Sequence, residues 1–291
     1  MPEVARSVIR RFPGVPTREG AGVRLRRSFS NAEVPLFDPF LLLDRFGSAD
    51  PEDYLAGFPW HPHRGIETIT YVLNGRVEHG DTLGNSGVIS DGDVQWMNSG
   101  SGIVHQEMPR RTDGTFTGFQ LWLNRPAREK MSTPAYRGLS QEEIPRVPTD
   151  LGGDVKVVAG SFAGVEGPVR GISVEPEYLD VRLTANEQLV LPVPGGRTAF
   201  AHGIEGVGTF DGSDGAPLAP GETALFGEGS LVRARAGSEG MRFLLASGWP
   251  LHEPVAWYGP IVMNTRDELA TAILELRHGT FVKDRRPRVE P

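Results

Sequence analysis

Residues 58–75, FPWHPHRGIETITYVLNG, contain the two patterns on which the prediction of the fold and of the functional site depends. Glu67–Leu73 alternates in polarity and is rich in β-branched residues, which predicts a half-buried β-strand. Asn74-Gly75 follows it with the residues that a tight hairpin turn prefers. Just before this strand stand His61 and His63, whose side chains point to the same face of an extended backbone.

The same strand pattern recurs along the whole chain. It is found at Val23–Arg27, Val94–Met97, Phe119–Leu123, Val155–Val158, Tyr178–Leu183, Thr198–Ala201 and Phe243–Ala246. The chain also contains 37 glycines and 24 prolines, which suit many short strands joined by tight turns. The spacing indicates an all-β sandwich or barrel and not alternating strands and helices.

The length and a break in the strand pattern predict two domains. Domains usually contain about 100–200 residues, and the chain has 291. Residues 126–147 are polar and rich in proline, as expected of a connection between domains. We therefore expect a first barrel at residues 1–130, a linker at 131–150 and a second barrel at 151–291.

One helix is predicted near residues 265–278. Thr265 and Glu268 can form a capping box at its start. An apolar stripe follows, made of Leu269, Ile273 and Leu276. Gly279 stands where such a helix would stop. We expect this helix to close the second barrel.

Composition excludes several classes of function. The 37 acidic and 30 basic side chains give a net charge of −7, which disfavours direct nucleic-acid binding. Cysteine is absent, so disulfides and thiolate metal sites are excluded. Residues 1–14 lack an apolar run of signal length, and no stretch approaches the ~20 apolar residues of a membrane span. We expect a cytoplasmic protein without membrane contact.

A second pair of potential metal ligands, His105 and Glu107, follows a glycine-rich turn. Side chains at i and i+2 of a strand share a face, so each pair projects together. If the two strands lie side by side, His61, His63, His105 and Glu107 converge on one point. Imidazole and carboxylate ligands suit iron, manganese, nickel, cobalt, zinc or copper, and four ligands leave open positions for a substrate. Pro62 cannot donate a ladder hydrogen bond, so this strand should be irregular or at an edge.

Glu67 is the main alternative ligand, because its spacing from His63 would put it on the same face of a regular strand. It could instead support a ligand or form an ion pair. Phe58, Arg64 and Met97 flank the two clusters and are candidates to line a substrate pocket, although core packing explains Met97 equally well.

Several motifs resemble those of the pirin family, within the cupin superfamily. They are His61-Pro62-His63-Arg64-Gly65, His105-Gln106-Glu107-Met108-Pro109, Asp38–Asp44, Gly92–Met97 and Tyr258–Thr265. The resemblance covers nearly the whole chain. It implies a bicupin, in which two antiparallel β-barrels of the jelly-roll type face each other, with a short C-terminal helix. It also implies one metal ion, most often Fe(II), in the N-terminal barrel only, and favours Glu107 over Glu67 as the fourth ligand.

The resemblance leaves two kinds of function open. Some pirins resemble quercetin 2,3-dioxygenases, which implies a small aromatic enol as substrate and Glu107 as the catalytic base. Others act through a protein partner, as iron-dependent transcriptional co-regulators or modulators of metabolic enzymes. A metal-dependent isomerase or another cupin activity is a third possibility.

Overall fold

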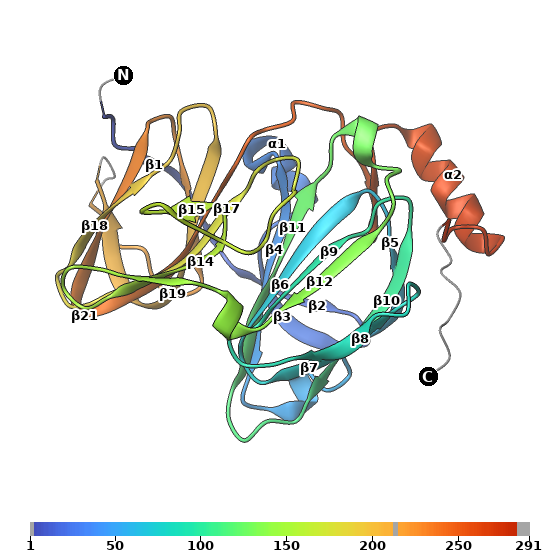
Figure 1. The fold of residues 1–291 in the computed structure, drawn as a ribbon, viewed down its shortest axis with the longest axis horizontal. Helices are drawn as coiled ribbons and strands as arrows, with labels where there is room; N and C mark the ends of the chain where they lie inside the picture. The colour runs from blue at the N-terminus through green and yellow to red at the C-terminus, as the bar shows by residue number, and fades with distance from the viewer. Residues whose placement is uncertain (1–2, 212–214, 284–291) are drawn as a thin grey trace. The chain divides into compact units, whose positions relative to one another are not determined.

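The structure is a computed structural model, and it describes residues 3–211 and 215–283. The chain forms two compact units (Figure 1). Unit 1 is built from the residues before 16, residues 32–39 and residues 142–250. Unit 2 is built from residues 16–31, residues 40–141 and the residues after 250. The two units carry the two cupin domains that the sequence predicted.

Unit 2 contains two antiparallel sheets. The larger has seven strands in the order β12-β9-β6-β11-β4-β3-β2, and the smaller has four in the order β5-β10-β7-β8. The strands are β2 (Val15–Glu19), β3 (Val23–Phe29), β4 (Phe40–Ser48), β5 (Phe58–His63), β6 (Ile66–Asn74), β7 (Arg76–Asp81), β8 (Ser86–Ile89), β9 (Val94–Asn98), β10 (Ile103–Arg110), β11 (Phe116–Asn124) and β12 (Ala135–Leu139). A hairpin of β22 (Ala256–Tyr258) and β23 (Ile261–Met263) and the helix α2 (Arg266–Arg277) complete the unit.

Unit 1 contains an eight-stranded antiparallel sheet, whose path runs β1-β20-β19-β21-β17-β14-β13, with β18 paired to β21. The strands are β1 (Val8–Pro13), β13 (Arg146–Pro148), β14 (Asp154–Ala159), β17 (Glu177–Leu183), β18 (Gln188–Pro192), β19 (Thr198–Phe210), β20 (Glu222–Phe226) and β21 (Leu231–Gly248). A small hairpin of β15 (Ser161–Phe162) and β16 (Val165–Glu166) and the short helix α1 (Val34–Phe37) belong to the same unit. Val157, Val181 and Phe243 are among the fully buried residues of its apolar core.

The two ends of the chain do not follow the expected domain boundaries. Strand β1 pairs with β20, so the N-terminal residues belong to the sheet of the second half. The C-terminal hairpin and α2 belong to unit 2, with the first half. The expected linker also contains strands, because β12 pairs with β9 and β13 pairs with β14. Local patterning could not reveal these pairings, since an edge strand can satisfy its hydrogen bonds on any open sheet edge.

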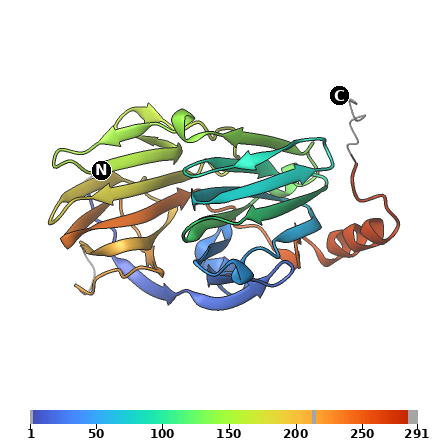
Figure 2. The same ribbon diagram turned by 90° about the horizontal axis from the view of Figure 1, so that it is seen from below.

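The predicted helix is present as α2, and Thr265 and Glu268 form the predicted capping box. The helix contacts β22 and β23 and belongs to unit 2, whereas from the sequence we assigned it to the second barrel. Figures 1 and 2 both show α2 outside the sheets of this unit. Within the described residues, no helix has the length and apolar character that crossing a membrane would require.

Strand β6 is buried on both faces, whereas the alternation predicted a half-buried strand. It is a central strand of the larger sheet, between β9 and β11. Its polar residues are buried because they find hydrogen-bonding partners: Thr70 donates to Glu107, and Glu67 accepts from Trp96. Strand β5 lies at the edge of its sheet, as Pro62 predicted.

Candidate metal centre

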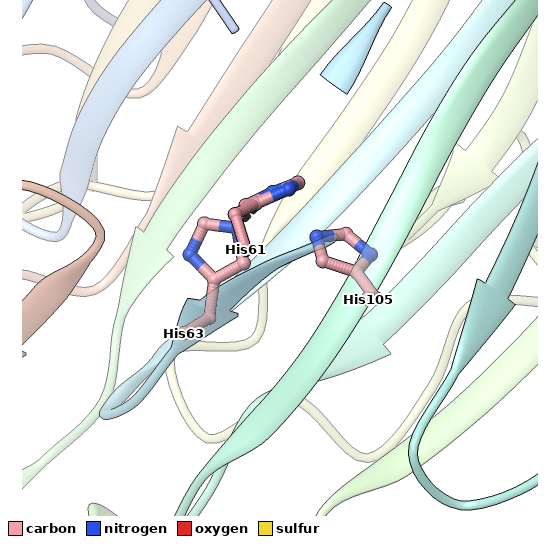
Figure 3. A group of neighbouring side chains, drawn as sticks. All are labelled: His61, His63 and His105. Carbon is pink, nitrogen blue, oxygen red and sulfur yellow. Dashed lines mark hydrogen bonds between the residues drawn. The ribbon is translucent and has the colours of Figure 1, made fainter. Parts of the chain in front are cut away.

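Three histidine side chains of unit 2 meet where β5 pairs with β10, and their rings point toward one another (Figure 3). His105 lies directly opposite His61 in the antiparallel register, so the two side chains share one face of the sheet. His63 follows two residues after His61 and projects to the same side. Strand pairing and the i, i+2 spacing together gather the three imidazoles.

The histidines are close enough to share one ion. All the ring nitrogens that define the group lie within 4.8 Å of one another. Nε2 of His61 and Nε2 of His63 are 3.1 Å apart, and the ring centres of His61 and His105 are 4.3 Å apart.

Hydrogen bonds to backbone carbonyls determine which ring nitrogens carry the protons. His61 Nδ1 donates to the carbonyl of Pro59 at 2.9 Å, and His63 Nδ1 donates to the carbonyl of Pro260 at 3.1 Å. Because a carbonyl only accepts, each neutral ring keeps its proton on Nδ1 and a lone pair on Nε2. The two Nε2 lone pairs therefore face each other, and Nε2 of His105 is buried without a partner. A cation here would satisfy all three nitrogens, so these residues fit a metal ion.

The electrostatic environment keeps two of these histidines neutral. Burial lowers the pKa of His63 well below its ordinary value, and the neighbouring His61 lowers it further. Burial also lowers the pKa of His105 well below its ordinary value, with a further contribution from the other imidazoles. Only a neutral imidazole can bind a metal, so the site is prepared for one near neutral pH.

Glu107 lies beside this group and is not a member of it. Glu107 follows His105 by two residues on β10 and is buried on the same face, because β10 pairs regularly with β7 here and the register shift against β5 adds a residue to β5. Glu107 Oε1 accepts from the hydroxyl of Thr70 at 3.1 Å, and Oε2 accepts from the amide of Gln120 at 2.9 Å. Burial raises the pKa of Glu107, although His61 and these hydrogen bonds favour its charged form. The carboxylate is thus a buried base next to three imidazoles.

Glu67 is engaged elsewhere. It is 1% exposed, forms an ion pair with Arg125 and accepts a hydrogen bond from the indole of Trp96 at 2.8 Å. The regular strand that would have aligned it with His63 is interrupted by the turn at Gly65, which has a φ of 77°. Of the interpretations that the sequence left open for Glu67, the structure agrees with the ion pair.

A cavity of about 710 Å³ opens beside His61 and His63. Its volume lies in the range that small organic ligands occupy, roughly 300–1,000 Å³. The lining residues all belong to unit 2. They include Phe58, Gln120, Trp122, Trp257 and Tyr258, together with the charged residues Glu19, Arg27 and Asp44.

The three predicted pocket residues have different outcomes. Phe58 lines the cavity, and its ring centre is 6.4 Å from that of His61. Arg64 is 2% exposed and is not among the lining residues, because it points toward the C-terminal segment and bonds to Glu275. Met97 is 1% exposed and also lies outside the lining, in the core of the unit. Arg64 and Met97 are therefore not residues of this cavity.

The sequence did not reveal two aromatic residues of the cavity wall. The ring of Trp122 meets that of His63 edge-on, with centres 5.1 Å apart. Trp257 lies against Trp122, with centres 5.9 Å apart and an angle of 31° between the planes. Trp122 was visible only as part of a predicted strand, and Trp257 precedes the motif at Tyr258–Thr265. Neither is near the histidines in sequence, so only the folded chain brings them together.

Comparisons with known proteins give a consistent result. The family model described as pirin matches residues 22–123, and the pirin C-terminal cupin domain matches residues 178–282. A pirin-like protein of Caulobacter vibrioides is 44% identical over 282 residues, covering 95% of this chain and 99% of that protein. A protein of Pseudomonas aeruginosa that is named, provisionally, as a quercetin 2,3-dioxygenase is 43% identical over 282 residues, covering 95% and 98%.

A solved structure also matches over nearly the full length. The crystal structure of a quercetin 2,3-dioxygenase from Acinetobacter baumannii is 30% identical and has a TM-score of 0.88. The match covers 96% of this chain and 99% of that one.

Proposed function

The chain belongs to the pirin family, and on this basis we propose that it is a metal-dependent dioxygenase of flavonol-like enols, with iron as its metal. The observation that carries the proposal is the group of three imidazoles with converging nitrogens, two of which, His61 and His63, line a cavity of ligand size. The names of the Pseudomonas aeruginosa and Acinetobacter baumannii proteins support the same activity.

The proposed metal ligands are His61, His63 and His105, with Glu107 as the fourth. Three nitrogens and one oxygen are donors that iron accepts, as do manganese, nickel, cobalt, zinc and copper. Bound there, the ion would supply Lewis acidity to a substrate oxygen and open positions at which dioxygen can react.

Glu107 is the residue we propose as the base. A flavonol must lose the proton of its enol hydroxyl before it can react with dioxygen, and a carboxylate whose pKa is raised by burial accepts that proton more readily. Gln120 lines the cavity and donates to Glu107 Oε2, so it connects the substrate space to the base. The proton would go to a carboxylate oxygen of Glu107.

The cavity wall suits a planar aromatic substrate. Phe58, Trp122 and Trp257 present apolar rings on which a flavonol can pack. Arg27 is bonded to Asp44 through two nitrogens at 2.8 and 2.7 Å, so its charge is already matched within the wall. Such a surface favours a neutral polyphenol that can donate hydrogen bonds to carboxylates.

The test is aerobic consumption of quercetin by the iron-loaded protein. We expect turnover, and we expect His63→Ala to lose at least about tenfold in both iron affinity and rate. His278→Ala is a matched control, since this histidine is exposed at the end of α2. The same assay with manganese, nickel, cobalt, zinc or copper in place of iron tests the choice of metal. If iron-loaded protein leaves quercetin unchanged, the substrate proposal is wrong.

A result of that kind would favour the alternative, a metal-dependent regulator that acts through a protein partner. Pull-down of the partner with iron-loaded and with metal-free protein would then distinguish a regulator whose metal is structural from one whose metal has a sensing role. Capture that depends on the metal would support a sensing role.

A further inference from the structure

The C-terminal segment of the chain reaches the proposed metal centre. Residues 256–263 form the β22–β23 hairpin, and the carbonyl of Pro260 in its turn accepts the Nδ1 proton of His63. Within the turn, the indole of Trp257 donates to the carbonyl of Gly259 at 2.7 Å. One of the three imidazoles is therefore oriented by a segment almost 200 residues away in sequence, since the bonded residues are 197 positions apart.

Arg64, the residue directly after His63, joins β5 to the end of this segment. Its Nε donates to the carbonyl of Ser101 at 2.7 Å, and a terminal nitrogen donates to the carbonyl of Phe281 at 2.9 Å. The same nitrogen lies 2.7 Å from a carboxylate oxygen of Glu275 on α2. The guanidinium also stacks on the ring of Phe281, 4.2 Å from its centre.

Burying a guanidinium destabilises the folded state unless its N–H groups are hydrogen-bonded and its charge is paired. The partners of Arg64 are therefore held in a fixed arrangement. Only 2% of the Arg64 side chain is exposed, against 23% for Glu275. Three N–H groups of the planar guanidinium donate hydrogen bonds in fixed directions, and the ammonium group of a lysine could not reproduce this arrangement. Arg64 thus fixes α2 and Phe281 relative to the strand that carries His63.

A second set of contacts holds the hairpin at the same place. The backbone N–H of Val262 donates to the carbonyl of Arg64 at 3.1 Å. The ammonium group of Lys130 donates to the carbonyls of Gly65 and Val262 and to the side chain of Asn124, at 2.7–2.9 Å. Val262 is two residues after Pro260, so these bonds set the position of the Pro260 carbonyl.

We propose that Arg64 is a positioning residue for the metal centre: by anchoring the C-terminal segment it keeps the Pro260 carbonyl on His63 Nδ1 and so directs His63 Nε2 at the metal. The inference rests on the proposed metal site and assigns to α2 and its hairpin a part in metal binding. Without the guanidinium, only the backbone bond of Val262 and the bonds of Lys130 hold the hairpin, so the Pro260 carbonyl is held less firmly on His63 and the imidazole is less firmly oriented.

The experiment compares Glu275→Gln and Arg64→Lys with the wild type. Glu275→Gln removes the charge of a partly exposed side chain and keeps its shape, so folding should be retained. Arg64→Lys keeps the buried charge and removes the planar fork. Glu78→Gln is the matched control, because Glu78 forms an ion pair with Arg110 on the surface of the same unit.

Each protein is loaded with Co(II), whose affinity is measured by competition with a chromophoric chelator and whose visible absorption reports the ligand geometry. We expect affinity to fall by about tenfold in Glu275→Gln and by up to about a hundredfold in Arg64→Lys, the range seen when partners of metal ligands are removed. The absorption spectrum should change in both variants and stay unchanged in Glu78→Gln.

A purely structural role for Arg64 would lower the unfolding temperature without altering the spectrum of the bound cobalt. Variants that are folded by circular dichroism and bind Co(II) with wild-type affinity and spectrum would refute the inference and leave the metal site intact. A wild-type protein that binds no Co(II) would instead refute the proposed metal site, and the inference with it.

Discussion

Gln120 determines how the carboxylate of Glu107 is held. The side-chain oxygen of Gln120 accepts from the indole of Trp122 at 2.9 Å. This bond turns the amide nitrogen toward Glu107, to which it donates at 2.9 Å, and toward the hydroxyl of Thr70 at 3.3 Å. Only one orientation of the amide satisfies these partners. The carboxylate of Glu107, the base of the proposed reaction, is therefore held by two successive hydrogen bonds, from Trp122 to Gln120 and from Gln120 to Glu107.

Gln120→Leu should therefore weaken the proposed reaction most at low pH. The substitution removes one of two donors to Glu107, and a carboxylate that loses a donor has a higher pKa. More of Glu107 is then protonated and unable to act as the base at a given pH below neutrality. We expect the acidic limb of the pH profile for quercetin turnover by the iron-loaded protein to move upward, by about one unit for a hydrogen bond worth roughly 1.5 kcal/mol.

Gln106→Leu is the control for this change. Gln106 lies between His105 and Glu107 on β10, so its side chain points to the other face of the strand. The same substitution there should leave the acidic limb in place. An equal shift in both variants would show that Gln120 has no particular connection to the base.

The sequence could predict the orientation of single side chains where this depends only on neighbouring residues of the same strand. The i, i+2 spacing is enough to place His61 and His63 on one face of a strand. It could not show that the side chains of Thr70 and Gln120 donate hydrogen bonds to the carboxylate of Glu107. It also could not detect that Arg64 turns away from the cavity, because its partner Glu275 is 211 positions further along.

At the scale of elements, the turn between β5 and β6 needs a glycine for two reasons. Gly65 has a φ of 77°, which side chains rarely adopt. A Cβ atom at this position would also lie 2.0 Å from the carbonyl oxygen of Val262 on β23. The close approach is what allows the C-terminal hairpin to reach the strand that carries the histidines.

Gly65→Ala should destabilise unit 2 by at least about 3 kcal/mol, from backbone strain plus a contact that forces two segments apart. Gly84→Ala is the control, since Gly84 has a φ of 90° and a Cβ added there would meet no atom within 4 Å. It should cost only the strain, about 1–2 kcal/mol. Urea unfolding followed by tryptophan fluorescence measures both, because Trp60, Trp96, Trp122 and Trp257 all belong to unit 2. Equal losses would mean that the approach to Val262 can relax.

Local signals were sufficient to predict most elements but not their partners. The alternation at Phe119–Leu123 corresponds to β11, and the capping box at Thr265 marks the start of α2. In contrast, no local pattern indicates that β1 pairs with β20 or that α2 contacts β22 and β23. Pairing depends on which sheet edge remains open after the rest of the chain has folded.

At the scale of the whole molecule, two cupin units could be expected from the sequence, but their composition from separate stretches of chain could not. Each end of the chain belongs to the unit formed mainly by the other half. The N-terminal strand β1 completes the sheet of unit 1, and the segment after residue 250 completes unit 2. The C-terminal residues that orient His63 are therefore an integral part of the unit that holds it. A division of the chain at its midpoint would remove them from the site.

The same burial that prepares the site makes the stability of the metal-free protein depend on pH. Folded His63 and His105 have pKa values well below their ordinary value, whereas the unfolded residues titrate near 6.5. Below about pH 6.5 the unfolded chain binds protons that the folded chain does not, so the free energy of unfolding falls as the pH falls. It is unaffected by these two groups at higher pH, where both states are neutral.

We therefore expect the free energy of unfolding of metal-free protein to decrease by up to about 1.4 kcal/mol per pH unit for each of the two histidines as the pH falls below 6.5. In His105→Gln one of the two contributions is absent, so the difference in stability between variant and wild type should change by up to about 1.4 kcal/mol per pH unit in the same window, in favour of the variant. Urea titrations at half-unit steps from pH 8 to pH 5 measure this difference. A difference that is constant with pH would mean that the folded protein protonates His105 as readily as the unfolded chain does, and that the buried imidazoles are not held neutral for a metal.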